Sequence, residues 1–355
     1  MVAPRLLFVA AGACLGLALA TPALADEPSI DHSKMDHSKT DHADHAGHPM
    51  TAEELAELRR KIPLYATFTD QQINENMSRM PPDTEDYLSP PGVRDKIGVL
   101  GLGHGYAGTG NDQFKAGYAA VAAVHPTAVG LGMSMMDSAH VQKAIDELEA
   151  AGATTIVVLP SETSETSSLV KQWRYMFGLS EESGYLPVPR VKTRAKIIMA
   201  TSPTRSDIIG RILGENLKSG SKDPAREVAM LIMHGPENKD ENDDELRNLA
   251  RLAVIARDTS GVAEVFYGSL QDDAPAEVRA ANVNAMRAWI EKARSAGKTV
   301  LVVPVLLTAG GSITRKINRD LAGLDYTLVD KGMMGHPLFA RWVQQTVADK
   351  TKDCC

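Results

Sequence analysis

A short apolar segment that ends in His-Gly occurs twice in this chain, and this repeat constrains the fold more than any other feature. The first copy spans residues 97–105 and contains His104, and the second spans residues 228–236 and contains His234. The two histidines are 130 residues apart. An apolar run closed by glycine is typical of a buried strand that ends in a tight turn. Repetition over this distance predicts two structural units of the same kind.

The segments that follow each copy alternate in the same order. In the first unit we predict strands at 127–131, 154–159 and 195–200, with helices at 138–151 and 206–218. In the second unit we predict strands at 263–267, 299–307 and 326–329, with helices at 276–296 and 338–347. Such alternation indicates parallel βαβ units with helices on both faces. The predicted fold is therefore α/β, with two tandem doubly wound parallel-sheet halves at 96–221 and 224–348.

The first 25 residues have the organisation of a secretory signal peptide. Arg5 precedes an apolar run at 6–20, and Ala23-Leu24-Ala25 supplies the small residues of a cleavage site. The run is shorter than the roughly 20 residues that cross a bilayer. We therefore expect residues 1–25 to be removed, the protein to be periplasmic or secreted, and no stable membrane span to remain after processing.

Residues 26–50 form a tract rich in Asp, His and Met, which is expected to be disordered without a ligand. Five of the ten histidines of the chain lie in this tract: His32, His37, His42, His45 and His48. Imidazole and carboxylate groups suit zinc, copper, nickel and cobalt, and methionine sulfur adds affinity for Cu⁺. We predict that these histidines bind metal, although the pattern leaves its identity open. A solvated linker is the alternative interpretation.

Residues 51–95 are predicted to be a helical lead-in and linker that packs on the first half. Thr51 and Glu54 have the spacing of a capping box, and proline pairs at 81–82 and 90–91 interrupt the chain before the first repeat. At the other end, residues 349–355 are predicted to be a tail. Its adjacent Cys354 and Cys355 cannot staple a core, so they are inert, bind a soft metal or form a vicinal disulfide.

The charge and composition argue against a nucleic-acid partner. Acidic residues exceed basic ones, giving a formal net charge of −7 at pH 7, and aromatic residues make up 5% of the chain. Nucleic-acid-binding proteins usually present basic surfaces, and those that bind single strands add aromatic stacking platforms.

Three motifs together resemble the class II chelatases, which include the sirohydrochlorin cobaltochelatases and ferrochelatases of cobalamin and sirohaem synthesis. They are the strand-His-Gly segment of each half, the sequence Val-Val-Pro-Val-Leu-Leu-Thr-Ala-Gly-Gly at 302–311, and Gly-His-Pro-Leu at 335–338. The resemblance covers residues 96–348. It implies a protein that inserts Co²⁺ or Fe²⁺ into a tetrapyrrole such as sirohydrochlorin. This chemistry needs a metal ligand, a base for the pyrrole protons and a cleft for the macrocycle, and neutral imidazole suits the first two roles.

The resemblance also implies a set of site residues. His104 and His234 take the position of the first metal-binding histidine, and both are predicted to be catalytic and to bind the metal. Acidic candidates follow the second strand of each half, namely Asp137 in the first and Asp272 with Asp273 in the second. The predicted substrate-binding residues are Gly103, Gly105, Asp137, Asp272, Gly310, Gly311, Ser312 and His336. The metal is a divalent transition ion, with cobalt, iron, nickel, copper and zinc all open.

This chain departs from the family at one position. The family commonly carries a second histidine in a Pro-Gly-x-His turn after the third strand. Here the second half has Gly310-Gly311-Ser312, and the first half has Ser-Glu-Thr-Ser-Glu at 161–165. A hydroxyl group binds Co²⁺ or Fe²⁺ poorly compared with imidazole. The alternative function is therefore a non-catalytic periplasmic carrier or buffer for a metal or a tetrapyrrole, for example in copper tolerance.

The remaining candidates have structural interpretations. Residues 103–108 fit the G-x-G-x-x-G pattern of dinucleotide-binding loops, but no acidic residue closes the second strand as ribose binding requires. His140 is expected to face solvent or the first turn of its helix, with metal binding as the alternative. His125 is expected to serve a turn. His336 has a second interpretation, as the cap of the final helix. Methionines 133, 135 and 136 are expected to fill the core.

Overall fold

The computed structural model describes residues 50–78 and 80–352. These residues belong to one compact unit, which spans 48–355. The predicted signal peptide, the five histidines of the tract and Cys354 and Cys355 lie outside the described residues. Within the described residues, no helix combines the length and the apolar character that crossing a bilayer requires.

The first described sheet has the strand order β1-β3-β2-β4-β5. Its parallel strands are β2 (Ile97–Gly103), β3 (Thr127–Leu131), β4 (Thr155–Pro160) and β5 (Lys196–Met199). The helices that follow the first three of these strands are α3 (Gly110–Ala122), α4 (Ala139–Ala150) and α5 (Ser168–Met176). The strand order reverses on either side of β2, which places the loop after β2 where doubly wound sheets bind ligands.

The second described sheet repeats this plan with the order β7-β6-β8-β9, and all of its pairings are parallel. Its strands are β6 (Glu227–Met233), β7 (Glu264–Ser269), β8 (Thr299–Pro304) and β9 (Thr327–Leu328). The intervening helices are α7 (Lys239–Ser260), α8 (Ala276–Ser295) and α9 (Ser312–Asp320). The prediction of two doubly wound parallel-sheet halves is confirmed. The strand predicted at 299–307 ends earlier, at Pro304.

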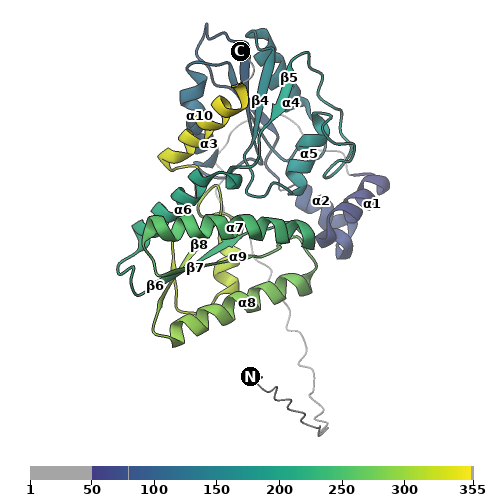
Figure 1. Ribbon diagram of the computed structural model, residues 1–355. Helices are drawn as coiled ribbons and strands as arrows, with labels where there is room; N and C mark the ends of the chain where they lie inside the picture. The colour runs from purple at the N-terminus through teal and green to yellow at the C-terminus, as the bar shows by residue number, and fades with distance from the viewer. Residues whose placement is uncertain (1–49, 79, 353–355) are drawn as a thin grey trace, which may run out of the picture. The chain divides into compact units, whose positions relative to one another are not determined.

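The helix that ends each half packs against the other half. Helix α6 (Asp207–Gly220) lies against α7, and α10 (Pro337–Thr351) lies against α3 (Figure 1). Glycines permit both approaches, because a Cβ at Gly210 would come within 2.8 Å of Ile255, and one at Gly117 within 2.8 Å of Phe339. We call α6 and α10 the exchanged helices, because each packs against the half that does not contain it. One continuous hydrophobic cluster therefore includes α3, both exchanged helices and inward-facing residues of both sheets. The units that repeat in the sequence are joined by a shared core.

The lead-in consists of α1 (Ala52–Lys61), the 3₁₀ helix η1 (Pro63–Thr67) and α2 (Asp70–Ser78), and a second 3₁₀ helix, η2 (Pro203–Arg205), precedes α6. The predicted capping box is present, since the Thr51 hydroxyl accepts the Glu54 N–H and the Glu54 carboxylate accepts the Thr51 N–H. Leu58 and Ile73 are fully buried in a cluster with Trp173 of α5. The lead-in therefore packs on the first half.

One strand of the lead-in was not expected from the sequence. Strand β1 (Thr84–Tyr87) pairs antiparallel with β3 at the edge of the first sheet. Its sequence, Thr-Glu-Asp-Tyr, has neither an apolar run nor an alternating pattern, so its conformation is set by pairing with β3 rather than by its own periodicity. The strand brings the residue just before it, Asp83, to the carboxyl end of β3.

Candidate functional site

The two repeated histidines occupy equivalent positions. His104 directly follows β2 and His234 directly follows β6, at the carboxyl edges of their sheets. Each is followed by a glycine with a left-handed backbone, Gly105 with φ of +83° and Gly235 with φ of +74°. Other residues adopt this conformation at a cost. The His-Gly pair is therefore the turn that carries an imidazole onto the ligand-binding edge.

The environments of these histidines differ. The His104 ring lies against Tyr106, with a centroid distance of 4.4 Å. The buried Tyr106 hydroxyl donates a hydrogen bond of 3.1 Å to the Ser161 carbonyl. Among the residues that the structure describes, His104 belongs to no group of three or more side chains with metal-ligand spacing.

His234 faces two carboxylates. Its Nε2 lies 3.8 Å from Asp272 Oδ2 and 3.7 Å from Asp273 Oδ2, and one ligand atom from each residue lies within 4.8 Å of the others. Its Nδ1 lies 2.9 Å from the carbonyl oxygen of Gly235. In neutral His234 this contact places the proton on Nδ1, because the carbonyl only accepts, and leaves the Nε2 lone pair directed toward the carboxylates. The His234 side chain is 31% exposed, which keeps it accessible to an ion.

Asp272 is restrained by two cations. Its side chain is 2% exposed, and its carboxylate accepts hydrogen bonds from Arg279 Nε at 2.8 Å and from Lys316 Nζ. Arg279 also pairs with Asp320. Burial alone raises the pKa of Asp272, but the bonds from Lys316 and Arg279 hold it below its ordinary value. Asp272 is therefore a restrained negative charge beside His234.

Asp273 has more freedom, because its side chain is 41% exposed. Its charge also affects His234. Burial lowers the pKa of His234, but the charges of Asp273 and Asp272 and the Gly235 carbonyl together raise it above its ordinary value. The raised pKa makes His234 bind a proton more readily than an ordinary imidazole, and a metal ion that binds Nε2 competes with that proton.

The charge of Asp273 also affects phenol groups in the first half and in the lead-in. Burial and then the negative charges of Asp273, Glu162 and Glu237 raise the pKa of Tyr185. Burial followed by the charge of Asp273 raises the pKa of Tyr65 as well. Close by, the Ser168 hydroxyl of α5 donates to Glu237 at 2.8 Å. The charge of Asp273 therefore acts on phenol groups of both the lead-in and the first half, and Glu237 joins the second half to α5.

The other predicted substrate-binding residues lie in three places. Gly103 and Gly105 flank His104. Gly310 and Gly311 precede α9, where a Cβ on either would meet nothing within 4 Å, and Ser312 begins that helix. His336 caps α10 by accepting the Leu338 N–H at 3.2 Å, and its Nε2 lies 3.0 Å from Glu215 of α6. The capping interpretation of His336 is confirmed.

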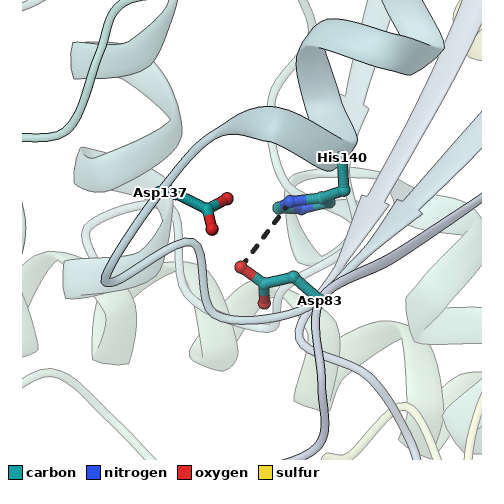
Figure 2. Close-up of side chains that lie close together, drawn as sticks. All are labelled: Asp83, Asp137 and His140. Carbon is teal, nitrogen blue, oxygen red and sulfur yellow. Dashed lines mark ion pairs between the residues drawn. The ribbon is translucent and has the colours of Figure 1, made fainter. Parts of the chain in front are cut away.

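A second cluster of metal-ligand type combines Asp83, Asp137 and His140 (Figure 2). Asp137 comes from the loop between β3 and α4, and His140 lies in the first turn of α4. Of the two expectations for His140, the one that faces it to solvent is wrong, because its side chain is 6% exposed in the first turn of α4. Asp83, which comes from the lead-in, was not a candidate. Gly132 makes room for Asp83, because a Cβ there would collide with its carboxylate, but this glycine does not reveal the contact in the sequence.

The charges of this second cluster are poorly solvated. Burial, with a further contribution from the charge of Asp137, raises the pKa of Asp83 to about 6. Burial lowers the pKa of His140 to about 4, although Asp137 and Glu85 oppose this. His140 is therefore neutral at pH 7.

The sequence matches no protein-family model and no curated protein. Solved structures of similar fold include two of SirB. SirB from Bacillus subtilis with Fe³⁺ has a TM-score of 0.54 and 17% identity, covering 73% of this chain and 97% of that one. The sirohydrochlorin chelatase SirB from Bacillus subtilis subspecies spizizenii in complex with cobalt has a TM-score of 0.50 and 14% identity, with the same coverage. Together with the two parallel-sheet halves, these similarities show that the protein has a class II chelatase-like fold.

Proposed function

We propose that this protein is a periplasmic metal-binding protein of the sirohydrochlorin chelatase type, which receives a divalent transition metal at His234 and inserts it into a tetrapyrrole. The observation that carries the proposal is the position of His234 Nε2, 3.8 Å and 3.7 Å from the carboxylates of Asp272 and Asp273 at the carboxyl edge of the second sheet. The fold similarity supports a chelatase-type scaffold.

Metal insertion releases two protons from the macrocycle, and the His234 cluster has groups that accept them. The contact between Nδ1 and the Gly235 carbonyl leaves Nε2 as the basic atom of the neutral ring. The raised pKa of His234 makes it a stronger base than an isolated imidazole. Asp273, on the exposed side, is placed to share the proton or the metal, while Asp272 is held by Arg279 and Lys316.

The donor set agrees with a transition metal as the substrate. One imidazole nitrogen with carboxylate oxygens suits ions such as Co²⁺, Fe²⁺ and Zn²⁺. The two similar structures are described with Fe³⁺ and with cobalt. The tract at 26–50 supplements this role in our proposal, because ligands tethered by a short flexible linker reach effective concentrations in the millimolar range.

A second candidate function, a metal or tetrapyrrole carrier, is favoured by the residues that stand where the family has its second histidine. In the first half this region begins with Ser161, which is fully buried, and its hydroxyl is hydrogen-bonded to Tyr118 at 3.1 Å. It is not available as a ligand. In the second half, Gly310 and Gly311 lack side-chain donors. A site with one imidazole holds a metal less firmly through the exchange with a macrocycle than a site with two.

The experiment that separates the two functions measures insertion directly. The full chain, with the five tract histidines changed to alanine, is mixed with sirohydrochlorin and Co²⁺ under anaerobic conditions, and the absorption change of the macrocycle is followed. We expect insertion faster than the protein-free rate, with loss of the acceleration in His234→Ala. The matched control is His125→Ala. His125 also pairs with a carboxylate, Asp95, at 2.6 Å, but it lies before β3, at the amino end of the first sheet.

The outcomes lead to different conclusions. Acceleration that His234→Ala removes and His125→Ala retains supports the enzyme. Tight binding of Co²⁺ or sirohydrochlorin without acceleration supports the carrier. Acceleration that survives in His234→Ala would overturn the assignment of this site.

A further inference from the structure

The cluster of Asp83, Asp137 and His140 contains a buried nitrogen without a partner. The Nδ1 atom of His140 is inaccessible to solvent and makes no hydrogen bond, and its side chain is 94% buried, as its exposure of 6% indicates. The closest charged atom is Asp83 Oδ2 at 3.6 Å, which is beyond hydrogen-bond distance. Figure 2 shows this ring nitrogen and the two carboxylates directed toward a common space. Buried polar atoms in folded proteins almost always have a partner.

We propose that Asp83, Asp137 and His140 form a further binding site for a divalent transition metal ion, separate from His234 and built in part by the lead-in. The site supplies one imidazole nitrogen and two carboxylate oxygens, and water from the surface completes the coordination. This donor set suits Zn²⁺ and Co²⁺. The proposal stands independently of tetrapyrrole insertion.

The distances agree with one ion between the three side chains. One ligand atom from each residue lies within 4.8 Å of the others. Ligand atoms about 2.1 Å from a tetrahedral ion are about 3.4 Å apart, which is close to the 3.6 Å between His140 Nδ1 and Asp83 Oδ2. A small movement of the Asp137 side chain toward the other two residues would bring its carboxylate oxygen within coordination distance of the same ion.

The other nitrogen of His140 has the partner that a metal-bound histidine requires. Nε2 lies 3.4 Å from the buried hydroxyl of Ser134. When Nε2 carries the proton and donates it to Ser134, the lone pair of Nδ1 faces the carboxylates. A hydrogen bond from the distal nitrogen commonly orients histidine ligands in metal sites.

The charge of the cluster calls for a cation. Within residues 50–78 and 80–352, no lysine or arginine forms an ion pair with Asp83 or Asp137, whereas Asp272 has both Arg279 and Lys316. Asp83 is only 25% exposed, so water solvates its charge incompletely. A divalent ion neutralises the two carboxylates.

Asp137 is the exposed member of the cluster, so the cluster faces the surface on that side. Asp137 lines a cavity of about 550 Å³ that also contains Gln142, Asp146, Arg190 and Lys192. One oxygen of Asp137 accepts the Ala139 N–H at 2.9 Å, which leaves the other for an ion. Because Asp83 precedes β1 and His140 lies on α4, a bound ion joins the lead-in to the first half.

The test uses Co²⁺ alone and the full chain with the five tract histidines changed to alanine. Crystals grown with Co²⁺ are examined by anomalous scattering, and bound ions are counted by calorimetry. We expect an anomalous peak about 2 Å from His140 Nδ1. Asp137→Asn should remove that peak and one bound ion per chain. The matched control, Asp146→Asn, changes a carboxylate of the same cavity and should keep both.

The design separates this proposal from the proposed function. Asp137 is exposed, so Asp137→Asn is expected to fold, and circular dichroism checks that it does. A peak at His234 without one at His140 would overturn the second site and leave the first intact. A peak at His140 that persists in His234→Ala supports the second site whether or not the protein inserts metal. A stoichiometry that Asp137→Asn leaves unchanged would also overturn it.

Discussion

The two halves repeat one framework but place their carboxylates beside different histidines. In the second half, Asp272 and Asp273 follow β7 and face His234, the residue at the end of the central strand. In the first half, Asp137 follows the equivalent strand β3 but shares a cluster with His140 on the next helix, while His104 packs against Tyr106. The repeated fold fixes the sheet edge at which ligands bind, and the loops determine which histidine lies beside the carboxylates.

The halves also differ in how their carboxylates are neutralised. Arg279 and Lys316 hold Asp272 in place without any ion, whereas the acidic groups of the first-half cluster have no such partner among the described residues. The second-half site is therefore preorganised by the protein, and the first-half cluster is completed by a cation. Four predictions test this difference, beginning with the largest expected effect.

The first prediction compares the repeated histidines. His234→Ala should slow metal insertion by about 10²- to 10⁴-fold, the usual contribution of a general base. His104→Ala should slow it by less than about tenfold by the same reasoning, because no carboxylate of the described residues forms an ion pair with its ring. Rates of Co²⁺ insertion into sirohydrochlorin measure both. A larger loss in His104→Ala would reverse the comparison between the halves.

The second prediction concerns the restrained carboxylate. Asp272→Ala should lower the free energy of unfolding by about 3 kcal/mol, because two hydrogen bonds between charged groups are lost. Arg279 then keeps only Asp320, and Lys316 loses its carboxylate partner. Urea unfolding of the metal-free protein measures this change. Asp273→Ala serves as the control and should change it by less than about 1 kcal/mol, as is usual for an exposed charge. Equal effects would show that Asp272 has no special structural role.

The third prediction concerns metal removal. Co²⁺ at 100 times its dissociation constant should stabilise the folded protein by about 2.7 kcal/mol per site, and a chelator should reverse the shift in melting temperature. Asp137→Asn should abolish the part that arises from the first-half cluster. If Asp137→Asn and its parent show identical shifts, the cation does not complete that cluster.

The fourth and smallest effect is a pH dependence. The pKa of Asp83 is about 6 in the folded protein, against about 3.9 in an unfolded chain. The folded state therefore retains a proton that the unfolded state loses, and this carboxyl group makes stability fall as pH rises from about 4 to 6. Metal-free Asp83→Asn should lack this decrease and gain stability relative to the parent across the same range. Urea unfolding at several pH values measures the difference, and parallel curves would contradict it.

Much of the fold follows from local sequence patterns. Apolar runs and their closing glycines predicted the strands of both parallel sheets, because buried parallel strands need continuous apolar sequence. Strand β1 could not be predicted in this way, since its polar residues take their conformation from pairing with β3. The packing of α6 and α10 against the other half could not be predicted either. The periodicity of a helix shows which of its faces is apolar, but not which sheet or helix covers that face.

The candidate site also has a part that the sequence predicts and a part that it does not. His234 and Asp272 were predicted from the repeat and from the loop after the second strand, and the structure brings them together. The meeting of Asp83 with His140 depends on contacts between residues 57 positions apart in the chain. No local pattern records such a contact, and the polar sequence around Asp83 resembles an ordinary linker.

The exchanged helices also affect how the chain folds during synthesis. Domains generally fold as units, with the N-terminal part first. Here the first sheet emerges from the ribosome without α10, so the surface of α3 that receives Phe339 and Trp342 stays exposed until the last described helix has been made. We therefore expect the first half to remain incompletely folded throughout translation of the second, and the two halves to become stable together in a single late step.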